Sequence, residues 1–471
     1  MINYKKGNCK KSLDIIETSR TRYLIEEMTQ SESRLGQYPG IEEIQKKIGP
    51  QQVLVEFSKF IGDTLIVYYV TRATIVVQIC NMSFFHSGEN HSSNTLLSDL
   101  TEARGMKKLA SSNVDLLPDI SSSSLKKFVE IRAELQKPSL SASSRIQIRK
   151  LYDTFIGSKS DVFLGKKEIV VVPDGVFNTI PFETMLCNDG ESLVQKFNIR
   201  YTPSLWVSEI IKTHQSMGMN RPGIAFGAAQ YETVSGLNPQ ILSEKELRSL
   251  RTQVTEAILS VHDLHPFYAK LGIGKWSDLL GTERETRGIK TVLQNLQICL
   301  GSNVEESTNK SLSQSGDLKK YSILHFATHG IFIPEVPELS GLVLSQLKSV
   351  VSEDDGYLTQ KEISELALSA DFVCLSACET GKGATYEGEG LVNLTHPFFV
   401  AGAKSICVST WSIADEATSD FMIEMYRTAR DNNYDFGYAI SETKRRFIRG
   451  TIGNGRYKAP YCWAAFEYFG N

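Results

Sequence analysis

Two short segments decide the fold predicted for this chain: SILHFATHG at residues 322–330 and DFVCLSACETG at residues 371–381. Each begins with a short apolar run and ends where polar residues lead to a glycine, which favours a strand buried on both faces. Strands of this kind belong to parallel sheets, whose sites lie beyond the carboxyl ends of the strands. If the two strands are neighbours, we expect His329 and Cys378 to meet in one crevice.

The sequence around these segments alternates between strand and helix patterns. Apolar, strand-like runs lie at 222–227, 297–300, 322–327, 371–377, 405–410 and 461–469, and helical stretches lie at 283–296, 359–368, 389–402 and 416–430. This alternation predicts an α/β fold in which helices cover both faces of a mainly parallel sheet. Residues 301–319 are polar and rich in turn formers, so we expect a mobile loop there.

The first half of the chain has an α/β pattern of its own. Residues 12–48 have helical spacing and are broken at Pro39-Gly40, and three β-branched and aromatic runs follow between Val53 and Cys80. Residues 125–157 return to helical spacing before a short buried strand at 167–173. We therefore divide the chain into a short N-terminal helical leader at 1–48, a first half at 49–215 and a second half at 216–471.

Composition limits the classes of function. The chain has 471 residues, a formal net charge of -3 and a pI of about 6.3, so we expect neither nucleic acid nor an anionic membrane to attract it directly. We find no apolar window long enough for a membrane-spanning helix and no signal peptide. Eight cysteines lack disulfide-like spacing, which predicts reduced thiols and a cytoplasmic location. No cofactor motif is expected.

Histidine and cysteine at two strand ends point to thiol chemistry. A thiolate is a strong nucleophile, and a nearby imidazole can take the thiol proton. The oxyanion of an acyl-transfer step needs fixed donors, which the backbone N–H groups of Gly330 and Cys378 would supply. Taken singly, each side chain has a plainer interpretation, because a lone buried cysteine is usually a small core residue and a lone histidine is usually structural.

A metal site is the competing chemistry. His325 and His329 are four positions apart, as are Cys374 and Cys378. Such pairs share a face on a helix, but on a strand four residues span about 13 Å, too far for one ion. The flanking apolar residues favour strands. We therefore interpret His325 and Cys374 as core residues.

At these motifs the chain resembles the CHAT domain, a caspase-like cysteine protease module often found behind tetratricopeptide repeats. The resemblance rests on HFATHG, LSACETGKG, EGEGLVNLTHPFFVAGAKSICVSTWSIADEAT, PYCWAAFEYFG and the upstream VVVPDGVFNTIPFETML. It covers roughly residues 50–471 and is densest from 321 to 420.

The resemblance implies the caspase-type fold that separases, metacaspases and gingipains share. It implies a catalytic dyad of His329 and Cys378, with Gly330 and the Cys378 amide as the oxyanion hole. It also implies that residues 49–215 are a degenerate caspase-like half and that the leader is the end of a repeat-like array. The segment Ser376-Ala-Cys-Glu-Thr-Gly departs from the caspase pattern Gln-Ala-Cys-x-Gly, so caspase specificity for aspartate does not carry over.

Candidates for the substrate pocket are Glu379, Trp411 and Asp415. Trp411 is suited to wall the pocket and Asp415 to pair with a basic side chain, which predicts Arg or Lys before the scissile bond. A small or apolar residue at this position is the alternative. Asp415 has an alternative interpretation, because a carboxylate at the start of the helix 416–430 stabilises the helix dipole.

These inferences predict a cysteine endopeptidase that cleaves a partner protein. We expect a regulatory protein or ribonucleoprotein to act through the N-terminal helices. Similar bacterial proteases serve immunity, some inside RNA-guided complexes and others by cutting a gasdermin, so the resemblance implies a role in antiviral defence. The alternative is a catalytically silent module that keeps the fold and binds a partner. The intact His329 and Cys378 favour the protease.

Overall fold

The computed structural model describes residues 9–17, 40–59, 64–81, 122–213, 221–231, 242–260, 263–274, 276–333, 335–347, 354–376, 378–379 and 394–470. Residues 1–8 and 18–39 of the predicted leader and the start of the helix predicted at 389–402 lie outside these residues. Residues 9–17 form a helix, and α3 (Ile41–Lys47) follows.

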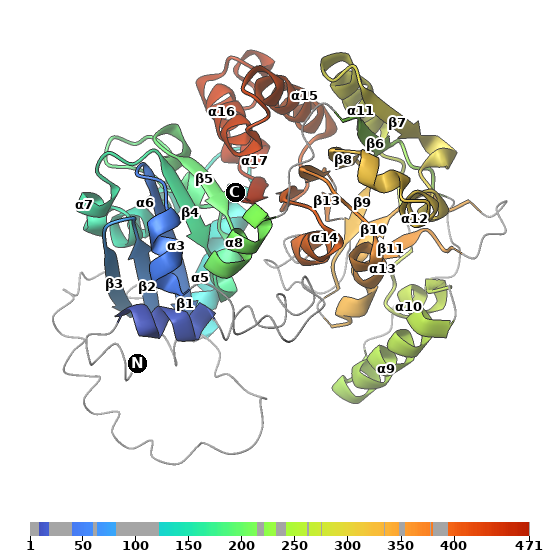
Figure 1. Ribbon diagram of the computed structural model, residues 1–471, viewed down its shortest axis with the longest axis horizontal. Helices are drawn as coiled ribbons and strands as arrows, with labels where there is room; N and C mark the ends of the chain where they lie inside the picture. The colour runs from blue at the N-terminus through green and yellow to red at the C-terminus, as the bar shows by residue number, and fades with distance from the viewer. Residues whose placement is uncertain are drawn as a thin grey trace.

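One large sheet organises the molecule (Figure 1). Its strands run in the order β3-β2-β1-β4-β5-β15-β14-β12-β8-β6-β7. Pairing is antiparallel within β1–β2–β3 and between β14 and β15, and parallel elsewhere. The strands are β1 (Gln52–Lys59), β2 (Thr64–Val70), β3 (Ile75–Asn81), β4 (Glu168–Val172), β5 (Asn198–Tyr201), β6 (Gly223–Gly227), β7 (Leu296–Leu300), β8 (Ile323–Phe326), β12 (Phe372–Leu375), β14 (Ser405–Ser409) and β15 (Phe466–Gly470). The predicted α/β fold with a mainly parallel sheet is confirmed.

Helices cover this sheet (Figure 1). They are α5 (Ser122–Leu135), α6 (Ala142–Phe155), α7 (Ser160–Phe163), α8 (Leu205–Thr213), α9 (Glu244–Ser260), α10 (His265–Lys270), α11 (Leu280–Val292), α12 (Glu306–Gln314), α13 (Gln360–Glu365), α14 (Thr395–Ala401), α15 (Asp415–Asp431), α16 (Phe436–Arg449) and α17 (Pro460–Trp463). Apolar side chains join the layers, as where Phe372 of β12 stacks on Phe436 of α16 with ring centroids 3.8 Å apart. Within the described residues, we find no helix whose length and apolar character would let it cross a membrane.

The C-terminal strand joins the two halves of the chain. β15 pairs with β14 of the second half and with β5 of the first, where Phe469 lies opposite Tyr201. Their rings are 5.4 Å apart between centroids. The sheet therefore continues across the boundary that we placed at residue 215.

A second, smaller sheet lies beyond the ends of the central strands. Its strands run in the order β11-β10-β9-β13, with β9 (His329–Ile331), β10 (Gly341–Val343), β11 (Tyr357–Thr359) and β13 (Cys378–Glu379). α9 and α10 pack on it through an apolar cluster that is separate from the main core. This second cluster contains Leu250 and Val254 of α9, Tyr268 of α10, and Ile331, Val343 and Tyr357 of the small sheet.

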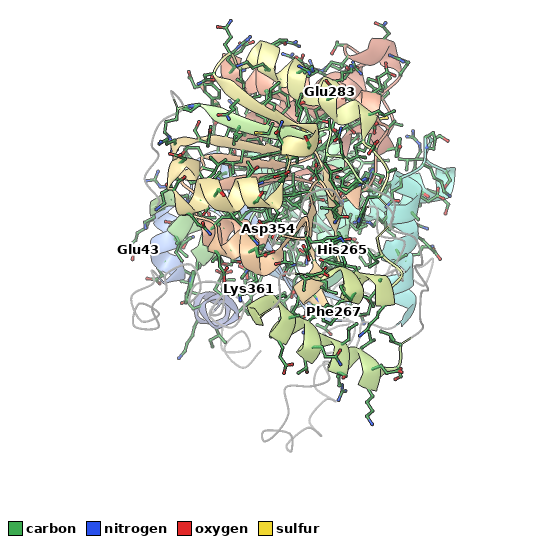
Figure 2. All side chains as sticks on the ribbon, turned by 90° about the vertical axis from the view of Figure 1, so that its right-hand side faces the viewer. Glu43, His265, Phe267, Glu283, Asp354 and Lys361 are labelled. Atoms are coloured by element: carbon green, nitrogen blue, oxygen red, sulfur yellow. The ribbon has the colours of Figure 1, made fainter. Side chains whose placement is uncertain are left out.

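The prediction of a mobile loop at 301–319 is wrong, because the segment is mostly helical. It contains the 3-10 turns Gly301–Asn303 and Asp317–Lys320 and the helix α12. The Nζ of Lys310 lies 2.8 Å from a carboxylate oxygen of Asp354, which Figure 2 labels, and 2.8 Å from one of Glu362. The polar residues that suggested a loop are thus paired with acids far away in the sequence.

Charged side chains are buried where the two halves meet. The Nζ of Lys444 in α16 lies 2.6 Å from Oε1 of Glu183, whose Oε2 accepts a 2.5 Å hydrogen bond from the hydroxyl of Tyr201. Glu467 of β15 is buried nearby. Burial and the charge of Glu183 together raise the pKa of Glu467 to about 8, against the opposing effects of Lys444 and Arg132.

The raised pKa of Glu467 predicts a pH-dependent stability. A carboxyl with a higher pKa in the folded state takes up a proton on folding, so its stabilising contribution is lost as the pH rises from about 4.5 through 8. We expect Glu467→Gln to raise the free energy of unfolding at pH 8.5 by about 3–4 kcal/mol relative to its effect at pH 5. Urea unfolding at both pH values measures this. The exposed Glu365→Gln is the control, and an equal effect of Glu467→Gln at both pH values contradicts the prediction.

Candidate active site

Strand register brings the two predicted site residues together. In the large sheet β8 and β12 are parallel neighbours, and His325 lies opposite Cys374. Beyond the ends of these strands, β9 and β13 also pair in parallel, and Cys378 lies opposite His329 and Glu379 opposite Gly330. The structure describes Cys378 and Glu379 through their backbone. The predicted neighbouring strands are therefore present, and the backbone at Cys378 lies beside the backbone at His329.

The imidazole of His329 has a defined orientation. Its side chain is buried, and Nε2 lies 2.7 Å from the carbonyl oxygen of Ser277. A carbonyl oxygen can only accept, so Nε2 must donate and must carry the hydrogen. In the neutral ring Nδ1 is then the nitrogen without a proton, and it is the one able to act as a base.

Two aromatic side chains hold the ring in place. The Trp276 ring is 5.2 Å from the His329 ring and the Tyr231 ring is 5.0 Å from it, measured between centroids. The hydroxyl of Tyr231 donates to the carbonyl of Val343 in β10 at 3.0 Å. These contacts restrict the ring of His329 to the orientation that the Ser277 carbonyl selects.

Burial sets the acidity of this histidine. It lowers the pKa of His329 below its usual range, because a buried imidazolium loses its hydration. The hydrogen bond that His329 donates to the Ser277 carbonyl and the negative charges of Asp415 and Asp278 act in the opposite direction and raise the pKa. At neutral pH the ring is therefore largely uncharged and able to accept a proton.

Asp415 lies near the site, but its carboxylate already has a partner. Asp415 is an exposed residue at the start of α15, and its Oδ2 accepts a 3.1 Å hydrogen bond from the N–H of Gly281 in the first turn of α11. A side chain at position 281 would clash, because its Cβ would lie 2.3 Å from the Cβ of Asp415. The alternative interpretation, a carboxylate at a helix start, thus fits α11 as well as α15.

Trp411 is buried rather than open to a pocket. Its Nε1 donates to the carbonyl of Tyr461 at 3.0 Å, and the guanidinium of Arg132 lies 5.8 Å from the centre of its ring. Its exposed fraction is 4%. The pocket roles of Trp411, Asp415 and Glu379 stay predictions.

Ser277 and Trp276 are site residues that the sequence analysis missed. Ser277 contributes only its backbone carbonyl, and a backbone group leaves no signature in the residue type. Trp276 is a large residue just before α11, which is a weak signal, since buried aromatic residues are usually core.

His325 and Cys374 are core residues, as predicted. Both are fully buried. His325 Nε2 lies 2.9 Å from Oε1 of Glu285 in α11, and Nδ1 lies 3.1 Å from the hydroxyl of Tyr426 in α15. His325 therefore ties α11 and α15 to β8. Both helices begin beside the site, at Leu280 and Asp415.

One group of side chains near the site has the ligand types that metals use. Donor atoms of Asp263, His265 on α10 (labelled in Figure 2) and Asp355 lie within 4.8 Å of one another. Both carboxylate oxygens of Asp355 already accept backbone N–H groups, from Leu264 at 2.6 Å and from Tyr357 at 2.9 Å. These bonds account for the position of Asp355 as a structural residue.

Comparison with known proteins identifies a family. The family model of the CHAT domain matches residues 145–471. Among curated proteins, none matches the sequence of this chain.

Solved structures that match this chain include a separase and a gingipain. Separase of Saccharomyces cerevisiae, in complex with securin, matches with a TM-score of 0.46 and 11% identity over 99% of this chain and 34% of its own. The Arg-specific cysteine proteinase gingipain R matches with a TM-score of 0.35 and 12% identity over 74% of each chain. The complex of the RgpB pro- and mature domains of Porphyromonas gingivalis matches with a TM-score of 0.36 and 12% identity over 74% of this chain and 76% of its own. This chain spans about a third of the length of the separase chain.

The geometry of His329 predicts its tautomer and its acidity. In Cys378→Ala protein, where no thiol competes for the proton, we expect His329 to titrate below about 6.5 and to carry its single proton on Nε2 when neutral. Nitrogen-15 NMR of histidine-labelled protein across pH 4–8 reads both properties, and loss of a signal in His329→Gln assigns it. A proton on Nδ1, or a pKa above 6.5, would contradict the geometry.

Proposed function

The chain belongs to the CHAT domain family, and from this premise we propose that it is a caspase-like cysteine endopeptidase with Cys378 as nucleophile and His329 as base. The observation that carries the proposal is the β9–β13 register, which sets Cys378 opposite His329. The orientation of His329 adds support, because Nε2 is bonded to the Ser277 carbonyl and Nδ1 is left as the basic nitrogen.

The proposed reaction has two steps. First, Nδ1 of His329 takes the thiol proton and the sulfur of Cys378 attacks the peptide carbonyl carbon. The resulting oxyanion accepts hydrogen bonds from the N–H groups of Gly330 and Cys378. The carbon–nitrogen bond breaks as His329 returns the proton to the leaving amine. Second, water attacks the thioester as His329 takes its proton, the carbon–sulfur bond breaks to release the carboxyl product and the thiolate, and His329 returns the proton to the sulfur. The Ser277 carbonyl stabilises the imidazolium that forms in each step.

The proposed substrate is a partner protein, and the proposed control is through the N-terminal helices. The helix 9–17 is bound to the first half, because the N–H of Trp206 in α8 donates to Oε2 of Glu17 at 2.9 Å. It is also bound to α3, because the N–H of Ile41 donates to Oδ1 of Asp14 at 2.7 Å. A regulatory protein or ribonucleoprotein bound there would act directly on this half. A cytoplasmic role in antiviral defence, in an RNA-guided or gasdermin-linked system, is proposed on family resemblance alone.

One observation favours the alternative of a catalytically silent interaction module. The exposed fraction of His329 is 1%, and a substrate must reach this residue for catalysis. An active enzyme therefore has to open the site, whereas a silent module has no such requirement. Reactivity of the cysteine separates the two functions.

The dyad is tested by substitution and by labelling. We expect Cys378→Ala and His329→Ala each to lower cleavage of a protein substrate by at least about 1,000-fold, because each removes a group that acts in the transition state. A thiol-reactive peptide probe should label Cys378 in the unmodified chain, as mass spectrometry of the labelled peptide would show. Cys299→Ser, on the edge strand β7, is the matched control and should keep full activity. Equal effects of wild type and Cys378→Ala on every partner would refute proteolysis.

Asp415 is proposed to favour a basic residue before the scissile bond. Its charge already acts on His329, so it lies close enough to influence a substrate at the dyad. We expect Asp415→Asn to lower kcat/KM about 10-fold or more for peptides with Arg or Lys at this position, the usual value of a charge-assisted hydrogen bond. Peptides with a neutral residue there are the internal control for the lost Gly281 contact. A library preference for acidic residues, or equal losses on both peptide classes, would remove this role.

A further inference from the structure

Trp276 connects the catalytic histidine to a residue on the far strand of the small sheet. Trp276 immediately precedes Ser277, whose carbonyl is bonded to His329. The indole Nε1 donates a 3.2 Å hydrogen bond to the hydroxyl of Tyr357 in β11. One side chain thus contacts the imidazole ring through its face and Tyr357 through its N–H.

Tyr357 is itself held firmly. It is buried, and its ring stacks on that of Tyr268 in α10 with centroids 3.8 Å apart. Tyr268 in turn donates to the carbonyl of Leu339 at 2.7 Å. The hydroxyl that receives the indole N–H therefore belongs to a side chain packed in the second apolar cluster rather than to a surface side chain.

The segment that carries Ser277 lies between two helices. Its described residues between the end of α10 and the start of α11 belong to no helix or strand, so no backbone ladder fixes the Ser277 carbonyl. The anchors here are side-chain contacts. One is the Trp276–Tyr357 bond, and another is Asp278, whose Oδ1 lies 3.4 Å from the backbone N of Tyr231.

We propose that Trp276 and Tyr357 are positioning residues, whose mutual hydrogen bond fixes the Ser277 carbonyl on Nε2 of His329. The inference rests on the proposed protease function for its catalytic meaning, although the positioning of His329 can be observed without catalysis. Neither residue touches the reacting atoms. Their effect passes through the carbonyl, which selects the Nε2–H tautomer and stabilises the imidazolium.

Loss of the Trp276–Tyr357 hydrogen bond should change the acidity of both His329 and Cys378. When the Ser277 carbonyl is less well fixed, the imidazolium loses stabilisation, so His329 becomes a weaker base. The thiolate that pairs with the imidazolium is disfavoured as well, and Cys378 then needs a higher pH to ionise. A purely packing role for Trp276 would lower stability without either shift.

The test compares two variants that keep the aromatic packing. Tyr357→Phe removes the acceptor hydroxyl and keeps the ring on Tyr268, and Trp276→Phe removes the donor N–H. Tyr69→Phe is the matched control, because it removes another buried hydroxyl, one that donates to Gln78 in the first half of the chain. Thermal unfolding of all three measures the general cost of losing a buried hydrogen bond.

Two readouts then decide the proposal. The pH midpoint of Cys378 alkylation by iodoacetamide should rise by about half a pH unit or more in Tyr357→Phe and Trp276→Phe and stay unchanged in Tyr69→Phe. In the Cys378→Ala background, the NMR titration midpoint of His329 should fall in the same two variants. The double variant should shift no further than the larger single one, because both remove one interaction.

The outcomes separate this proposal from the protease itself. If Cys378 never reacts but the His329 titration shifts as expected, the protease function fails and the positioning role stands. If both midpoints match the wild type in Tyr357→Phe, the positioning role is overturned even in an active protease. Should one variant fail to fold, the other carries the same test.

Discussion

The site depends on one constraint: the register of β8 and β12 is kept when the chain leaves the large sheet. His325 lies opposite Cys374 in the large sheet, and His329 lies opposite Cys378 in the small one. Both strands advance four residues between these pairs, so neither slips relative to the other. A shift of one residue in either strand would turn its side chains to the opposite face and separate the two predicted catalytic groups. The matched spacing, which first suggested a metal site, is what this double register requires.

The two helices that begin at the site, α11 and α15, are bound to the strand β8. The buried His325 binds Glu285 of α11 and Tyr426 of α15, so the strand that precedes the proposed base His329 also fixes the positions of both helices. Their first turns then meet at the hydrogen bond between Asp415 and the amide of Gly281. The charges of Asp415 and Asp278 raise the pKa of His329, but burial lowers it by more. The pKa of His329 therefore stays lowered although acidic residues lie near it.

Sequence patterns predicted those parts of the molecule that depend on local periodicity. The buried strands, the helices between them and the neighbouring positions of His329 and Cys378 follow from apolar runs and from the rules of parallel sheets. Features that depend on distant partners were not predictable in the same way. In the helical segment 301–319, Lys310 pairs with the distant residues Asp354 and Glu362. The orientation of His329 depends on a backbone carbonyl, which every residue type provides. Neither the helical structure of 301–319 nor the orientation of His329 can be predicted from local composition.

The molecule has two apolar cores, and the orientation of His329 depends on the smaller one. The large sheet and its helices share one core, whereas α9, α10 and the small sheet share another. His329 belongs to β9 of the small sheet, and its orientation depends on Ser277 at the end of the α9–α10 segment. Small cores with fewer buried contacts open at lower free energy than large ones. The histidine can therefore lose its orientation while the large sheet stays folded, so the order of the site is set by the second core rather than by the stability of the whole molecule.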